Sequence, residues 1–134
     1  VDAPIGRHPR DRVKMAVVAT GKPAVTHYRV LQRFETLSHV RCQLESGRTH
    51  QIRVHMAHIG HPLLGDVVYG ARLRLPKQAT ESTRKLLQQF PRQALHAEQL
   101  GLVHPVTGEN MQWQAPLPED MQELLQALRE ETLA

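Results

Sequence analysis

Residues 46–55, SGRTHQIRVH, concentrate side chains that can do chemistry. A serine–glycine pair is followed by two arginines five positions apart, with two histidines and a glutamine beside them. Such a group can bind phosphate, hold a metal ion, orient a catalytic carboxylate, or lie on a solvated helix. Which of these it does depends on the elements that position it.

Arg48 is a candidate phosphate ligand. The alternating pattern of a strand ends at Leu44, a Ser-Gly turn follows, and a helical pattern opens beside Arg48. The free N–H groups of a helix N-terminus and the fork of a guanidinium both suit an anion. Thr49 is expected to cap or begin this helix.

Arg53 lies at the edge of the helix that should follow. The apolar stripe of that helix is predicted to consist of Ile52, Met56 and Ile59. Arg53 stands roughly 60–120° from the stripe on a helical wheel, among small neighbours. A half-buried arginine is costly unless it is paired, so a partner anion is expected. The alternative is a solvated arginine whose methylene groups cover the helix edge.

Other chemistries find less support in the sequence. Four histidines fall within twelve positions: His50, His55, His58 and His61. The usual chelating pairs bring a carboxylate or cysteine, whereas the nearest acid, Asp66, follows a proline break, so structural histidines are favoured over a metal site. The sequence contains no Gly-x-Ser-x-Gly elbow, no P-loop and no Gly-x-Gly-x-x-Gly.

The bulk properties favour a polyanionic partner. The 134 residues carry a net charge of +4 and a pI near 9.7, which suits phosphate contacts with nucleic acid. Aromatic residues make up 4%, so arginine and backbone contacts should dominate over base stacking. No apolar run approaches the roughly 20 residues of a membrane helix. A single cysteine, Cys42, fits a reducing cytosol, and we expect a cytoplasmic protein.

The periodicities predict one domain of the α+β class. Period-two alternation favours strands in residues 24–34 and 39–45, following a strand in 12–18. A further strand in 94–104 returns through 111–115. Helices are expected after residue 49, near 82–90, and after "PLPED", where an apolar stripe contains Met121, Leu124, Leu125 and Leu128. The expected architecture is a mainly antiparallel sheet with flanking helices.

Residues 44–70, LESGRTHQIRVHMAHIGHPLLGDVVYG, closely resemble the most characteristic segment of the bacterial ribosomal large-subunit pseudouridine synthases. The stretches 15–34 and 94–121 are similar to the same family. The resemblance implies an isomerase that turns uridine into pseudouridine within large-subunit ribosomal RNA, using no cofactor. It also implies that residues 1–134 are the C-terminal part of a single catalytic domain.

The family's nucleophile is an aspartate in a His-Arg-Leu-Asp-type motif, which this sequence lacks; "HPRDR", with Asp11, is only a superficial echo. The chain alone is therefore expected to be inactive. By resemblance, Arg53 matches the arginine that pairs with that aspartate, and Asp66 matches a position thought structural. Candidate RNA contacts are Arg48, His50, Gln51 and His55. The alternative function is a non-catalytic basic RNA-binding module.

Overall fold

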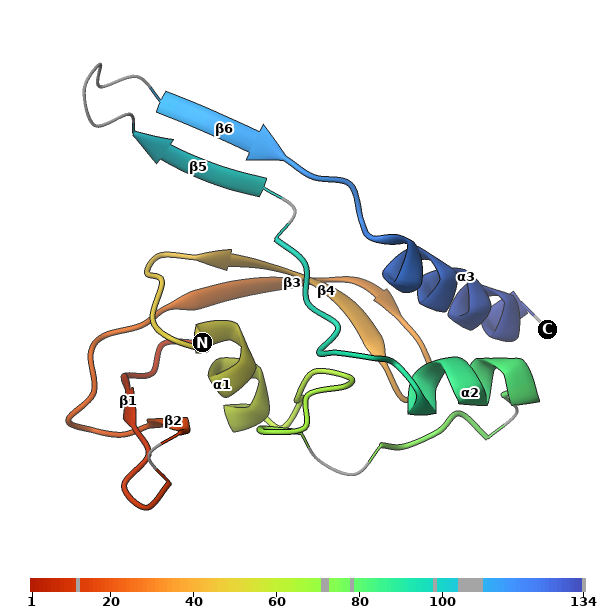
Figure 1. Cartoon of the computed structure of the whole chain (residues 1–134), viewed down its shortest axis with the longest axis horizontal. Helices are drawn as coiled ribbons and strands as arrows, with labels where there is room; N and C mark the ends of the chain where they lie inside the picture. Colours follow the sequence, from red (N-terminus) through yellow and green to blue (C-terminus); the bar gives the residue numbers. More distant parts are fainter. Residues whose placement is uncertain (12, 71–72, 78, 98, 104–109, 134) are drawn as a thin grey trace.

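The structure is a computed structural model that describes residues 1–11, 13–70, 73–77, 79–97, 99–103 and 110–133. Its strands are β1 (Ile5–Arg7), β2 (Met15–Val17), β3 (Thr26–Arg33), β4 (Ser38–Leu44), β5 (Gln99–Val103) and β6 (Asn110–Gln114). Its helices are α1 (Gln51–His58), α2 (Glu81–Gln88) and α3 (Glu119–Leu133), as Figure 1 shows. The α+β class is confirmed.

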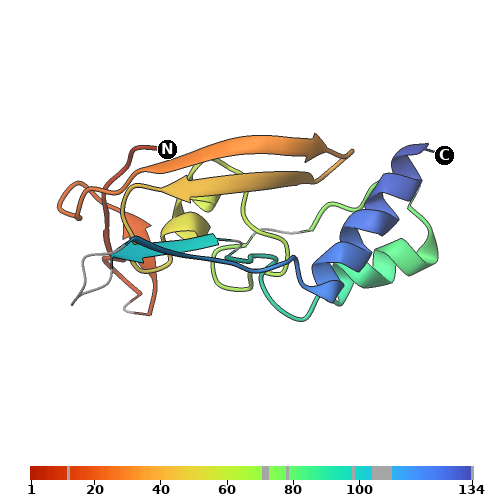
Figure 2. The same cartoon turned by 90° about the horizontal axis from the view of Figure 1, so that it is seen from above.

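The strands pair as separate antiparallel hairpins. Within the described ranges, β1 pairs with β2, β3 with β4, and β5 with β6, so the expected single sheet is divided into three two-stranded pieces. Helix α1 lies on one face of the β3–β4 hairpin and beside β2 (Figures 1 and 2). The connection expected between the strands in 94–104 and 111–115 includes residues 104–109, which lie outside the described residues.

The alternation along residues 24–34 predicts the strand well and its buried face only in part. Thr26 is fully buried, but Tyr28, which regular alternation would place on the same face, is 48% exposed. The register shifts between Val30 and Gln32, which leaves Leu31 as a bulge. Because β3 and β4 pair only with each other in the described chain, much of the hairpin surface stays open.

Helix α1 buries a different face from the one predicted. Its N-cap is His50, in the left-handed conformation with φ 55° and no capping side chain, so the expectation that Thr49 caps the helix is wrong. The buried residues of the helix are Gln51, Val54, His55 and Met56. Two of the four are polar, and their hydrogen bonds make that burial possible.

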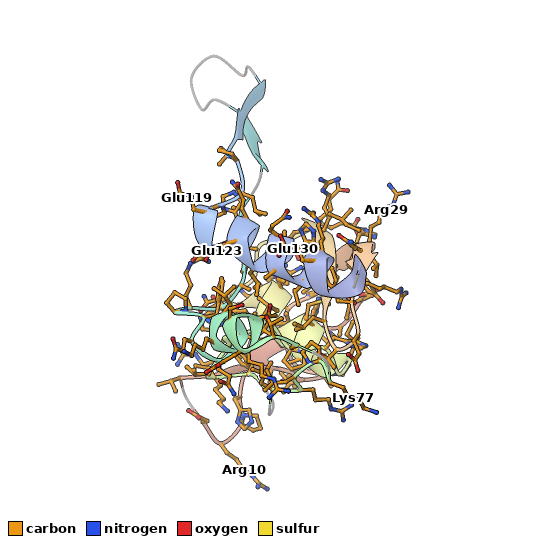
Figure 3. The ribbon with its side chains drawn as sticks, turned by 90° about the vertical axis from the view of Figure 1, so that its right-hand side faces the viewer. Arg10, Arg29, Lys77, Glu119, Glu123 and Glu130 are labelled. Carbon is orange, nitrogen blue, oxygen red and sulfur yellow. The ribbon has the colours of Figure 1, made fainter. Side chains whose placement is uncertain are left out.

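Two apolar clusters hold the elements together. Ile5 of β1, Ala24 and Val54 of α1 form one, with Tyr69 packed against it. Leu87 of α2 packs with Leu124 and Leu128 of α3 in the other, which confirms the predicted stripe. The acidic side chains of α3 labelled in Figure 3, Glu119, Glu123 and Glu130, are exposed. No helix in the described residues has the length and apolarity needed to span a bilayer.

Candidate functional site

Arg53 and Asp66 form a buried ion pair. The Arg53 Nε atom donates to Asp66 Oδ2 at 2.9 Å and Nη2 donates to Oδ1 at 3.0 Å. The Arg53 side chain is 13% exposed and the Asp66 side chain is fully buried. Two parallel hydrogen bonds of this kind fix a guanidinium in position as well as in charge. The expected half-buried, anion-seeking arginine is therefore present.

Within the described residues, Arg53 has a partner that was not expected. Asp66, thirteen residues further on, pairs with it, and the pairing of Arg53 with an aspartate outside residues 1–134 stays a prediction. The stop of the helix at residues 59–62 and the turn that follows return the chain to the helix edge. Asp66 stands in this structure as the residue that holds Arg53 in place.

The turn at residues 65–70 is built to present Asp66. Its Oδ1 atom also accepts hydrogen bonds from the backbone N–H groups of Val68 and Tyr69, both at 3.1 Å. Gly65 has φ +77°, and a Cβ there would lie 2.1 Å from the carbonyl oxygen of Arg92. Only glycine suits that position, because both the backbone conformation and the neighbouring chain exclude a side chain.

The charges of the pair reinforce each other. Burial raises the pKa of the Asp66 carboxyl, but hydrogen bonds from Arg53, Tyr69 and Val68 outweigh it and hold the pKa below its usual value. The hydrogen bond with Asp66 raises the pKa of the Arg53 guanidinium. Both groups therefore stay ionised at neutral pH.

Tyr69 connects this pair to the rest of the site. The Arg53 guanidinium carbon lies 4.9 Å from the centre of the Tyr69 ring. The Tyr69 hydroxyl accepts the backbone N–H of Met15 on β2 and is 2.8 Å from His50 Nδ1. A hydroxyl that accepts one hydrogen bond can donate its own proton to that nitrogen. Tyr69 thus links β2, the start of α1 and the Arg53–Asp66 pair.

Gln51 holds the loop before α1 in shape. Its Oε1 atom accepts hydrogen bonds from Ser46 Oγ and the backbone N–H of Arg48, and its Nε2 atom donates to Val25 O and Thr26 Oγ1. The residue is 3% exposed. The expectation that Gln51 contacts RNA is therefore corrected, since its amide is used within the fold; its structural role is the one observed.

His55 is likewise internal. It is fully buried, with Nε2 2.8 Å from Ala3 O and Nδ1 2.7 Å from Thr26 Oγ1. A carbonyl can only accept, so Nε2 carries the proton and Nδ1 accepts from the threonine hydroxyl. The expectation of RNA contact by His55 is wrong, because both ring nitrogens are occupied inside the protein.

Arg48 and His50 remain at the surface. Arg48 donates from Nε to Pro23 O at 2.9 Å, and its two Nη groups make no hydrogen bond to the described part of the chain. His50 uses Nδ1 toward Tyr69 and is partly exposed. Among the described residues no three His, Cys, Asp or Glu side chains are grouped as metal ligands.

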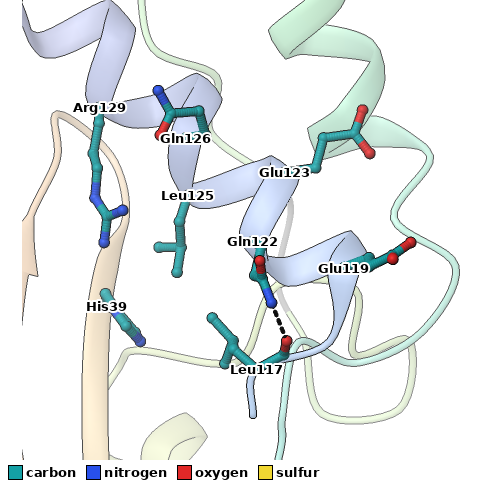
Figure 4. Close-up of a pocket in the computed structure, with 8 residues that line it drawn as sticks. All are labelled: His39, Leu117, Glu119, Gln122, Glu123, Leu125, Gln126 and Arg129. Carbon is teal, nitrogen blue, oxygen red and sulfur yellow. Dashed lines mark hydrogen bonds between the residues drawn. The ribbon is translucent and has the colours of Figure 1, made fainter.

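A hollow of about 550 Å³ lies between β4 and α3 (Figure 4). His39, Leu125 and Arg129 line it, together with the acidic Glu119 and Glu123. Arg129 donates from Nε to Gln32, and Gln122 donates to Leu117 O, the bond drawn in Figure 4. Its mixture of charges does not favour one class of ligand.

Sequence reasoning missed Asp66 as the partner of Arg53 and Tyr69 as the connecting residue. A signal for Asp66 was present: it is an acid between turn glycines, where carboxylates commonly accept backbone N–H groups two and three residues on. No comparable signal marks Tyr69, because its contacts join segments 54 and 19 residues apart.

Comparison with known proteins gives a consistent result. The sequence model of a family described as RNA pseudouridylate synthase matches residues 1–58. Ribosomal large subunit pseudouridine synthase D of Pseudomonas aeruginosa is 60% identical over 98% of this chain and 41% of its own length. The protein of that name from Escherichia coli is 57% identical over 96% of this chain and 40% of its own length.

Solved structures agree at the level of the fold. Human RNA pseudouridylate synthase domain containing 1 superposes with a TM-score of 0.64 at 27% identity, over 96% of this chain and 58% of that one. Human RNA pseudouridylate synthase domain containing 4 gives 0.61 at 33% identity, over 96% and 55%. The chain spans about two fifths of the length of the curated relatives it matches. By sequence and by fold, this chain is similar to part of the ribosomal large-subunit pseudouridine synthases.

Proposed function

We propose that the protein to which this chain belongs isomerises uridine to pseudouridine in large-subunit ribosomal RNA, in the cytoplasm and without a cofactor. In this proposal residues 1–134 are the C-terminal part of the catalytic domain, and the nucleophilic aspartate lies outside them. The observation that carries the proposal is the largely buried Arg53 guanidinium, held by the two hydrogen bonds that it donates to the Asp66 carboxylate, in a segment that is similar to the named synthases.

Arg53 has the geometry of a positioning residue. Arg53 donates its Nε–H and one Nη2–H to Asp66, so three of the five guanidinium N–H groups are not taken by that carboxylate. A second carboxylate can therefore be held on the other edge of the same guanidinium, which Asp66 keeps from rotating. A neighbouring guanidinium would keep the pKa of such a nucleophilic carboxyl low and the group ionised.

Arg48 and His50 are the proposed RNA contacts of this segment. The Nη groups of Arg48 face no acceptor in the described chain, and His50 Nε2 is not used by the Tyr69 contact. Both residues are within five positions of Arg53, so RNA held by them would lie beside the proposed reaction centre. Arginine donors suit phosphate oxygens in a chain that is poor in aromatic residues.

The proposal is tested by Arg53→Lys in the longer protein. Joining the base to ribose through C5 displaces the C5 hydrogen, so tritium release from C5-labelled RNA measures turnover. We expect a loss of roughly 100-fold, because a point charge cannot hold two carboxylates in a fixed geometry. The acidic limb of the pH–turnover profile should move to higher pH as the nucleophile loses its planar partner, a shift that a purely structural role would not produce.

The matched control is Arg84→Lys on α2, whose side chain is exposed and remote in sequence from the site. It should leave turnover unchanged. Near-normal turnover and an unshifted profile in Arg53→Lys would refute the role of Arg53. A longer protein that binds ribosomal RNA without releasing tritium would instead identify a non-catalytic RNA-binding module.

A further inference from the structure

We propose that Arg7, Lys22 and Arg48 together form a binding site for phosphate groups of an RNA backbone. The inference rests on the proposed function, since it takes RNA as the ligand, and it adds two residues from outside the recognised motif. The site is a hollow of about 430 Å³ between β1, the turn after β2, and the loop before α1. One water takes about 30 Å³ of liquid volume, so the hollow has room for more than one small anion.

The three cations come from separate segments, and each backbone is fixed. Arg7 ends β1 and is in register with Met15 of β2. Lys22 exchanges two backbone hydrogen bonds with Ile5, both 2.9 Å. Arg48 is held through its backbone by Gln51 and through its Nε by Pro23 O. Cationic side chains on fixed backbone lose less entropy on binding an anion than those on a mobile loop.

The charge of the hollow is not neutralised from within. Its lining contains three cationic side chains and no carboxylate in the described part of the chain. Arg7 and Lys22 are exposed and make no ion pair with any described residue, in contrast to the buried Arg53. Thr20 and Thr49 add hydroxyl groups that can donate to phosphate oxygens. Uncompensated positive charge in a concave surface concentrates polyanions.

Glycines bring the walls of the hollow together. The backbone of Gly21 lies so close to that of Ile5 and Gly6 that a Cβ at residue 21 would lie 2.5 Å from the Ile5 carbonyl carbon and 2.8 Å from Gly6 N. Gly6, Gly21 and Gly47 all line the hollow, so backbone rather than side chain forms much of its surface. A bulky phosphate can approach such a surface closely.

The hollow adjoins the candidate site. Met15 of β2 lines the hollow, and the backbone N–H of Met15 donates a hydrogen bond to the Tyr69 hydroxyl. Thr49 lines it one residue before His50. RNA whose phosphates are held by Arg7, Lys22 and Arg48 would therefore lie next to the Arg53–Asp66 pair. These contacts would position the RNA without reading its sequence.

The test measures RNA binding by the 134-residue chain and does not depend on isomerisation. Fluorescence anisotropy of an end-labelled RNA hairpin is followed between 50 and 200 mM KCl for wild type, Arg7→Gln and Lys22→Gln. Each variant should bind roughly three- to tenfold more weakly at 100 mM KCl, and the slope of log K against log salt should fall by about 1. The matched controls are Arg84→Gln and Lys77→Gln, exposed cations on other surfaces, which should stay within about twofold of wild type.

A second arm separates RNA from free phosphate. Replacing chloride by inorganic phosphate at equal ionic strength should leave RNA binding by the wild type unchanged. Displacement of the RNA by phosphate alone would mark a small-anion site and overturn the proposal. Equal losses of RNA affinity in the hollow variants (Arg7→Gln, Lys22→Gln) and in the control variants would also overturn it, as would a wild-type chain that does not bind the hairpin. Weaker RNA binding by the hollow variants together with an inactive longer protein would refute the enzyme proposal and leave the RNA site supported.

Discussion

Replacing Asp66 by alanine should lower the free energy of unfolding by about 3–5 kcal/mol, because it leaves a largely buried guanidinium without its carboxylate. Asp66 accepts two hydrogen bonds from Arg53 and one each from the N–H groups of Val68 and Tyr69. In the alanine variant all four N–H donors lose their acceptor at once. Urea denaturation at pH 7 measures the effect.

The control for Asp66 is an exposed carboxylate with a hydrogen bond of similar length. His27 Nε2 and Glu45 Oε2 are 2.8 Å apart on the open side of the β3–β4 hairpin. Glu45→Ala should change the free energy of unfolding by less than about 1 kcal/mol, since water replaces the lost contact. If Asp66→Ala lowered the free energy of unfolding as little as Glu45→Ala, the Arg53–Asp66 pair would not stabilise the fold as a buried ion pair.

Acid should remove the same stabilisation. The folded pKa of Asp66 lies below its unfolded value, so the contribution is fully present above the ordinary carboxyl pKa of about 4 and is lost as the pH falls through the folded pKa. The difference in unfolding free energy between wild type and Asp66→Ala should therefore be constant near neutrality and shrink in acid.

His55→Ala should cost about 3–5 kcal/mol, for a different reason. The ring is fully buried and links Thr26 to Ala3, so its removal opens a cavity, leaves the proton of the Thr26 hydroxyl without its acceptor, and leaves the Ala3 carbonyl without its donor. Hydrogen exchange at the Thr26 amide, together with urea denaturation, reports on the loss. The expected result is global destabilisation with faster exchange at the N-terminal segment.

His58→Ala is the matched control, because His58 is on the same helix and is exposed. It should leave the free energy of unfolding within about 0.5 kcal/mol of wild type, as for most surface substitutions. Comparable losses at residues 55 and 58 would show that the buried hydrogen-bond chain contributes nothing beyond general helix effects.

Elements with an apolar period were predictable from the sequence. The stripe of α3 and the alternation of β3 and β4 placed those elements to within a few residues, because apolar side chains at the right spacing must face a core. β1 was not predicted, since three residues that include a glycine carry no readable period. The buried face of α1 was misassigned because two of its residues, Gln51 and His55, are polar.

The candidate site was predictable in kind and not in partner. The place of Arg53 at the helix margin implied a half-buried arginine that needs an anion, and the structure bears this out. The identity of the anion depends on the path of the chain after residue 60. The positions of residues on a helical wheel carry no information about that path. Burial of Gln51 and His55 depends on acceptors in residues 3, 25 and 26, contacts that no local spacing reveals.

The most direct test of the account is the pseudouridine content of large-subunit ribosomal RNA after incubation with the longer protein and, separately, with the 134-residue chain. The longer protein should convert uridine to pseudouridine, and the chain alone should convert none, because Arg53 then has no nucleophilic carboxylate to orient. Pseudouridine formed by the chain alone, or none formed by the longer protein, would contradict the account.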